Sequence, residues 1–236
     1  MDTNATHYVI DVLSADWWKI NFAWISALTF LLFFTKNKSE ATRQLVGKCI
    51  GGFMLLNFLA GQLNEIFTNT WHYSNSLPLQ LCSLSVFLSI FLMNKRNQWV
   101  YEILLCWSAG AIHSFITPEL TTNRSTFNLF EYTIAHGGIL ISGIYATLRL
   151  GYVPRKWSWL KVLAFTQLTL PTIGVLNYFI DSNYMYFREK PLANNPFLIG
   201  EWPYYIIGLQ AAALLHFFLF IKFHQWLGRK NQLATS

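Results

Sequence analysis

Long apolar runs recur seven times along the chain and are separated by short polar segments. Each run is close to the roughly 20 residues that an α-helix needs to cross the hydrocarbon core of a bilayer. We therefore predict an all-α, polytopic membrane protein, a single domain of seven transmembrane helices over residues 1–236. The predicted helices cover residues 17–35, 45–67, 77–93, 99–117, 128–150, 160–181 and 202–226.

The composition agrees with this pattern. Apolar residues make up 53% of the chain and charged residues only 12%, about half of the ~25% that is usual in soluble domains. So few charges cannot cover the surface of a soluble protein of this size, which excludes an ordinary globular domain, a disordered protein and a nucleic-acid-binding protein. We expect a multi-pass protein of the cell membrane that acts on membrane lipids and binds no nucleic acid. The apolar pattern does not indicate an oligomeric state.

The positions of the basic residues predict an orientation. With seven spans, successive connections alternate between the two sides of the membrane. One side holds only four basic residues, Lys19, Arg124, Arg188 and Lys190, which leaves 13 of the 17 for the other side. Because Lys and Arg accumulate in cytoplasmic connections, we predict an external N-terminus and a cytoplasmic C-terminus.

Polar residues within the predicted helices crowd toward the outer leaflet, whereas the inner halves of several helices are mostly Leu, Ile and Phe. A channel or transporter would carry polar groups across the full depth or near the midplane. The pattern favours a cup open to the outer leaflet, which suits lipid chemistry. The alternative is a non-enzymatic small-molecule permease or substrate-binding membrane subunit that holds a solute in this outward-facing pocket.

Cys82 is the candidate nucleophile. It stands about five residues into the third predicted helix, or roughly 7–8 Å at 1.5 Å per residue. A thiol needs a base to become a strong nucleophile in such surroundings, and His136 lies at similar depth on the fifth helix. If the two residues cooperate, these helices must be neighbours. A small core cysteine and a hydrogen-bonding histidine are the structural alternative.

Other polar residues are candidates for supporting roles. We expect His113 and Glu131 to assist the catalytic pair, and Asn64, Gln80 or Asn177 to donate hydrogen bonds to an oxyanion. The segment after the sixth helix offers Asn183, Tyr184, Arg188 and Lys190, either as a lid on a lipid phosphate or as an interfacial loop without a ligand. No HExxH or HxH spacing is present, so we expect neither a metal nor a cofactor.

Five short segments together resemble a known family. They are LPLQLC at 77–82, TPEL at 117–120, AHG at 135–137, NYMYF at 183–187 followed by KP at 190–191, and GEWPYY at 200–205. In this order and spacing they resemble the YwaF-like bacterial integral membrane proteins, a family similar to the eukaryotic transmembrane protein 164 group.

The resemblance implies a seven-helix intramembrane enzyme that moves a fatty acyl chain between phospholipids, with Cys82 as nucleophile and His136 as base. Two positions depart from the bacterial pattern. Gln80 stands where a histidine is frequent, and Glu201 where a proline is frequent. Since an amide donates a hydrogen bond but cannot shuttle a proton, Gln80 cannot activate Cys82 as a base.

Overall fold

The computed structural model describes residues 8–120, 125–191 and 197–233. These residues form seven α-helices, namely α1 (Ala15–Thr35), α2 (Glu40–Phe67), α3 (Leu81–Asn94), α4 (Gln98–Ile116), α5 (Thr126–Arg149), α6 (Ser158–Phe179) and α7 (Tyr204–Leu233). The 3-10 turn η1 (Tyr184–Tyr186) precedes α7. Two short strands, β1 (Tyr8–Val9) and β2 (Glu119–Leu120), pair in antiparallel register. The predicted all-α class is confirmed.

Five of the helices are long and apolar enough to cross a membrane, namely α1, α2, α4, α6 and α7. At 14 residues α3 is shorter than the span that a bilayer requires. The 24-residue helix α5 is long enough, but Asn128, Glu131 and His136 interrupt its apolar sequence. The count of seven membrane crossings therefore stays a prediction.

The third helix begins later than predicted. Residues 77–80 are not helical, and Gln80 is an N-cap with extended backbone, at φ −69° and ψ 149°. Pro78 accounts for part of this difference, because the residue before a proline is pushed away from helical geometry. Cys82 consequently lies in the first turn of α3 rather than about five residues into the helix.

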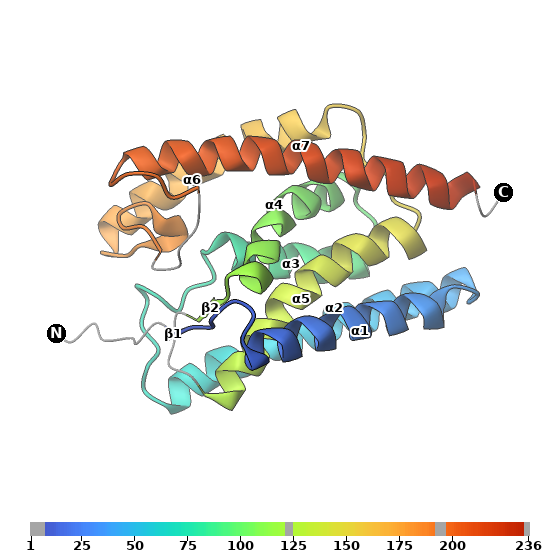
Figure 1. Cartoon of the computed structure of the whole chain (residues 1–236), viewed down its shortest axis with the longest axis horizontal. Helices are drawn as coiled ribbons and strands as arrows, with labels where there is room; N and C mark the ends of the chain where they lie inside the picture. The colour runs from blue at the N-terminus through green and yellow to red at the C-terminus, as the bar shows by residue number, and fades with distance from the viewer. Residues whose placement is uncertain (1–7, 121–124, 192–196, 234–236) are drawn as a thin grey trace.

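The helices are arranged around α4 and α5 (Figure 1). Helix α5 packs against α2, α3 and α4 and also touches α1 and α7. In the view of Figure 1, α1 and α2 lie below the central helices, and α6 and α7 lie above them. Residues 101–109 of α4 are all buried, so α4 is the core element on which the neighbouring helices pack.

The two ends of the bundle differ in character. At one end the α1–α2, α3–α4 and α5–α6 connections meet through arginines. Arg96 Nη2 donates to the carbonyl of Leu150 (2.8 Å), and Arg149 Nη2 donates to the carbonyl of Leu32 (2.6 Å). The opposite end holds the β1–β2 pair, the α2–α3 connection and η1 (Figure 1). We refer to them as the basic end and the site end.

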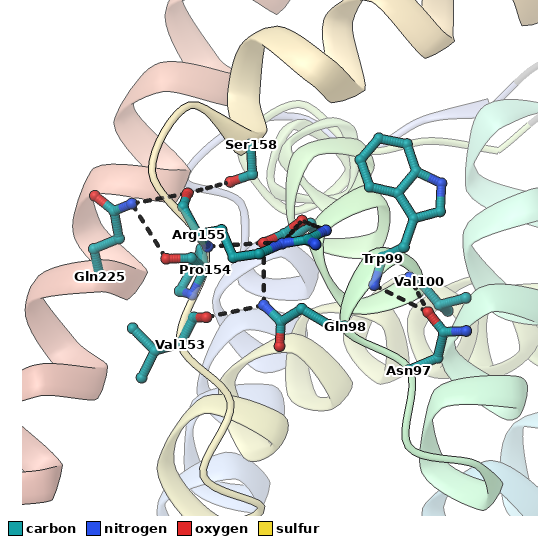
Figure 2. A network of polar contacts seen from close by, with 10 residues as sticks. Asn97, Gln98, Trp99, Val100, Val153, Pro154, Arg155, Ser158 and Gln225 are labelled. Atoms are coloured by element: carbon teal, nitrogen blue, oxygen red, sulfur yellow. Dashed lines mark hydrogen bonds and ion pairs between the residues drawn. The ribbon is translucent and has the colours of Figure 1, made fainter.

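A buried carboxylate lies at the basic end and accepts hydrogen bonds from Arg155 and Gln98, which are labelled in the network of Figure 2. Glu102 of α4 is fully buried, and its two oxygens accept hydrogen bonds from the Arg155 guanidinium (Nη2–Oε2 2.7 Å; Nε–Oε1 3.0 Å). The backbone N–H of Arg155 (2.7 Å) and the Gln98 amide (3.0 Å) donate to the same carboxylate. This pairing raises the pKa of Arg155 and fastens the α5–α6 connection to α4.

Candidate functional site

Cys82 lies at the site end, partly exposed, in the first turn of α3. Its thiol is close enough to the phenols of Tyr132 and Tyr186 to interact with them electrostatically. The first N–H groups of a helix have no carbonyl acceptor within that helix and favour negative charge. The start of α3 therefore brings the thiol next to two phenols and to backbone donors.

Tyr132 connects the thiol to the neighbouring elements. Its hydroxyl donates to the carbonyl of Ser114 near the end of α4 (3.2 Å) and accepts from the backbone N–H of Glu119 in β2. Two hydrogen bonds to fixed backbone groups hold the phenol in one position. The phenol therefore links α5 to the end of α4 and to β2.

His136 lies one turn after Tyr132 on the same face of α5. The two ring centroids are 4.2 Å apart, and Nδ1 of His136 is 2.8 Å from the carbonyl oxygen of Tyr132. Because a carbonyl can only accept, Nδ1 carries the proton of the neutral imidazole and Nε2 keeps its lone pair. This is the tautomer that a general base requires. Helices α3 and α5 pack against each other, as cooperation requires, while the direct contact between Cys82 and His136 stays a prediction.

Tyr186 reaches the same place from η1. Burial raises the pKa of its phenol, and the nearby Glu119, Cys82 and Tyr132 act in the same direction. The phenol therefore stays protonated at neutral pH. The carbonyl of Tyr186 accepts a hydrogen bond from the hydroxyl of Tyr205 in α7 (2.6 Å), which ties η1 to the start of the last helix.

Asn177, one of the proposed oxyanion donors, holds the segment around η1. It is almost fully buried, and its Oδ1 accepts from the Ser182 hydroxyl (2.7 Å) and from the backbone N–H of Tyr184 (3.0 Å). Its amide Nδ2 donates to the carbonyl of Tyr184 (2.8 Å). These three bonds use the Asn177 amide to hold residues 182–184 against the end of α6. Its role as an oxyanion donor stays a prediction.

Tyr184 and Gln80 join this loop to the α2–α3 connection. The Tyr184 hydroxyl accepts from the backbone N–H of Leu77 and donates to the carbonyl of Tyr73, both at 2.9 Å. Gln80 Oε1 accepts from the backbone N–H of Met185 (2.8 Å). We refer to the two joined segments, residues 72–80 and 182–190, as the cap. Gln80 is also the N-cap residue of α3. The two segments of the cap are therefore joined to each other only two residues from Cys82.

The charged residues of the cap pair with acidic partners. Arg188 forms an ion pair with Asp181, which raises the pKa of the arginine, and Lys190 Nζ lies 2.6 Å from Glu201 Oε1. Asn183 Oδ1 accepts the backbone N–H groups of Arg188 (2.9 Å) and Glu189 (3.2 Å). Both basic side chains remain accessible, at 52% and 39% exposure. Their binding of a lipid phosphate stays a prediction.

Glu131 of α5 contacts α2, the helix that carries Asn64. A Cβ added to Gly61 would lie 3.3 Å from Cγ of Glu131, and the Glu131 carboxylate interacts electrostatically with Glu65. Asn57 Nδ2 donates to the Glu131 carbonyl (3.1 Å). The side chain of Asn64 makes no hydrogen bond within the part of the chain that the structure describes. Support of the catalytic pair by these two residues stays a prediction.

His113 belongs to a second cluster, between α4 and α7. Its Nε2 lies 3.3 Å from Nε2 of His216, and Nδ1 of His216 lies 2.6 Å from the carbonyl of Ala212. Sequence reasoning missed His216, Tyr132 and Tyr186. Tyr132 had a signal, because it precedes His136 by four residues on a helix. The other two come from distant elements, and no local pattern indicates them.

Comparison with known proteins identifies the family to which the chain belongs. The model described as the TMEM164 family matches residues 12–221. Neither a curated protein nor a solved structure matches the chain. The matched residues include the whole cap, Cys82, His136 and the beginning of α7.

Proposed function

Because the chain belongs to the TMEM164 family, we propose that it is an intramembrane acyltransferase of the cell membrane that moves a fatty acyl chain between phospholipids. Cys82 is the nucleophile and His136 is the base. The observation that carries this proposal is the tautomer of His136, whose Nδ1–H is committed to the Tyr132 carbonyl, next to the phenol that interacts electrostatically with the Cys82 thiol.

In the first half of the reaction, Nε2 of His136 takes the thiol proton and Sγ of Cys82 attacks the ester carbonyl of a donor phospholipid. The tetrahedral intermediate collapses to a thioester, and the lyso-lipid oxygen leaves with the proton from Nε2. The N–H groups of the first turn of α3, the turn that carries Cys82, are suited to stabilise the oxyanion. The amide of Gln80, the N-cap residue of the same helix, is a candidate side-chain donor to the oxyanion.

In the second half, the hydroxyl of an acceptor lyso-lipid gives its proton to His136 and attacks the thioester. The thiolate leaves and recovers the proton from Nε2, which restores the starting state. If water takes the place of the lyso-lipid hydroxyl, the same site acts as a phospholipase. We expect Arg188 and Lys190 of the cap, which are partly exposed, to attract the phosphate of either lipid.

The test is to incubate the purified chain with a labelled phospholipid and a lyso-lipid, then search for an acyl adduct by intact-protein and peptide mass spectrometry. We expect the adduct on Cys82. Cys82→Ser removes the thiol at little cost in volume and should abolish transfer, because a hydroxyl is a far weaker acid. Cys49→Ser, at an exposed position on α2, should retain full activity.

His136→Gln should behave as Cys82→Ser does, since the amide hydrogen-bonds but accepts no proton at neutral pH. Wild-type turnover by Cys82→Ser together with an inactive His136→Gln would contradict the covalent mechanism. Direct attack of a lyso-lipid hydroxyl on the donor ester, with His136 as the sole base, would then replace it. Absence of any transfer or hydrolysis by the wild-type protein would refute the enzymatic proposal.

A further inference from the structure

An elongated cavity of about 430 Å³ lies between α1, α4, α5 and α7. Its volume falls within the ~300–1,000 Å³ of pockets that hold small organic ligands. On α4 the lining extends from Ser108 to Ile116, about 12 Å at 1.5 Å per residue. That length approaches the ~15 Å depth of one leaflet, half of a 30 Å hydrocarbon core.

The wall of the cavity is apolar. Ile112 of α4, Leu140 and Ile144 of α5, and Leu219 and Phe220 of α7 supply much of it. Exposed apolar surface of this kind, inside a bundle that packs in a bilayer, accommodates a hydrocarbon chain without loss of hydrogen bonds.

Polar lining groups are already committed to protein partners. Asn21 Nδ2 donates to the carbonyls of Trp17 (2.9 Å) and Phe115 (3.2 Å), and the Ser108 hydroxyl donates to the carbonyl of Leu105 (2.8 Å). Nδ1 of His224 lies 2.6 Å from the hydroxyl of Thr147. A polar solute would find few free partners here, so the lining favours an apolar occupant.

Two residues that line the cavity contact the turn of α5 that carries the proposed base. Trp24 and Phe115 line the cavity with ring centroids 5.2 Å apart. Both rings contact the position of Gly137, since a Cβ there would lie 2.2 Å from Trp24 and 3.5 Å from Phe115. Gly137 directly follows His136. Along α5 the sequence His136, Leu140, Ile144 repeats every four residues and so forms one stripe that leads from the base into the cavity.

Trp24 also supplies an unsatisfied donor next to this turn. Its indole Nε1–H is buried and has no acceptor among the described residues, although a buried donor without a partner costs about 1–3 kcal/mol. An ester carbonyl is an acceptor of the kind that this position lacks. The donor lies against Gly137, one residue from His136, so a small rotation of the indole toward the cavity would pair it with the carbonyl end of a bound acyl chain, with the methyl end deeper.

We propose that this cavity binds the fatty acyl chain of the donor lipid, with the carbonyl end next to His136. The inference rests on the proposed acyl transfer for its role, and it adds where the chain lies and what limits its length. A chain that extends past Ile112 and Ile144 fills the cavity. A bulkier side chain at either residue shortens the part of the cavity that is open to the acyl chain.

The first test measures transfer from donor phospholipids that differ only in acyl-chain length, with the full chain reconstituted in vesicles. We expect Ile112→Trp and Ile144→Trp to lower the rate for the longest chains, relative to the shortest, by at least about ten-fold, the loss for one or two displaced methylenes. Leu168→Trp, on α6 at a position 73% exposed and outside the cavity, should keep the wild-type profile.

The second test requires no catalysis. A phospholipid with a photoreactive diazirine in its acyl chain should crosslink the Cys82→Ser protein on residues 108–116 and 140–144. Crosslinks confined to residues that do not line the cavity, or identical length profiles for Ile144→Trp and the wild type, would overturn the cavity assignment. Crosslinks in the cavity without any acyl transfer by the wild type would instead refute the proposed function and leave the chain-binding site standing.

Discussion

Gly137 is the position at which a single methyl group most disturbs the wall beside His136. A Cβ there would lie 2.2 Å from Cδ1 and 2.4 Å from Nε1 of Trp24, so either the indole or α5 has to move. Alanine is otherwise the better helix former, by up to about 1 kcal/mol. We expect Gly137→Ala to lower the temperature of unfolding in detergent and to reduce acyl transfer.

Gly110→Ala is the matched control. It places a methyl group on α4 where no atom lies within 4 Å, so its unfolding temperature should equal or exceed that of the wild type. Equal stability and activity for both variants would show that the contact between Trp24 and Gly137 is dispensable.

At the scale of single residues, part of the site was predictable. Cys82 and His136 were chosen by residue type and depth, and the helices that carry them pack together. The role of Asn177 in the loop could not be foreseen, because its partners depend on how residues 182–184 fold back on α6. The pairing of His113 with His216 joins residues more than a hundred positions apart. A helical repeat relates only residues a few positions apart, so the sequence pattern could not predict this pair.

Helix boundaries follow local chemistry, and most were predictable within a few residues. Ser14, Ser39 and Ser125 each accept a backbone N–H at the start of a helix, as N-cap residues do. The larger differences are at the start of α2 (40 rather than 45), the start of α3 (81 rather than 77) and the end of α7 (233 rather than 226). In α3 the apolar pattern continues through Leu77 and Leu79 although the backbone is not yet helical. Hydrophobicity alone cannot separate a buried extended segment from the first turn of a helix.

The Glu102–Arg155 pair fastens two elements, and its loss should be costly. Arg155→Ala leaves the fully buried Glu102 carboxylate with only the Gln98 amide and one backbone N–H. Breaking a buried pair costs about 3–5 kcal/mol, and we expect the lower end of this range because the arginine side chain is 53% exposed. Denaturant unfolding of the protein in detergent measures the change.

Adding Glu102→Gln to Arg155→Ala should recover part of the stability, since no unpaired charge then remains in the core. Arg229→Ala provides the comparison, because that guanidinium bonds to the carbonyl of Gln225 one turn earlier on an exposed surface. A loss after Arg155→Ala no greater than after Arg229→Ala would show that the pair does not fasten the connection.

The cap should open when Asn177 is shortened. Asn177→Ala removes three hydrogen bonds to Ser182 and Tyr184, each of which contributes about 1 kcal/mol. Local opening of residues 182–187 should become easier, and their amide hydrogen exchange faster by on the order of 100-fold. Exchange in α5 should remain unchanged.

Thr172→Ala on the same helix is the control for Asn177→Ala. The Thr172 hydroxyl bonds to the carbonyl of Leu168 one turn earlier, so exchange in the cap should match the wild type. Equal exchange for Asn177→Ala and Thr172→Ala would mean that other contacts, such as those of the Tyr184 hydroxyl, hold the cap by themselves.

On the scale of the whole molecule, the proposed reactive residues and the arginine contacts lie at opposite ends of the bundle. Cys82, the phenols and the cap occupy the site end, and the arginine contacts occupy the basic end. The C-terminal part of α7 joins the basic end, where Gln225 Nε2 donates to the carbonyl of Pro154 (3.2 Å). This agrees with an alternating path, in which every second connection returns to the same end.

The orientation of the bundle in the membrane stays a prediction. The sequence assigns only four of its 17 basic residues to the predicted outer side, so the positive-inside rule predicts that the basic end lies in the cytoplasm. A fluorescent reporter that matures only in the cytoplasm should therefore be bright when fused after Ser236. The same reporter fused after Asp181, at the end of the sixth predicted helix, should stay dark, because that point lies at the site end. The reverse pattern would refute the orientation, and equal brightness at both points would refute a membrane crossing by α7. Either result would contradict the predicted location of Cys82 and the cap at the outer leaflet, and with it the set of lipids that the proposed enzyme could reach.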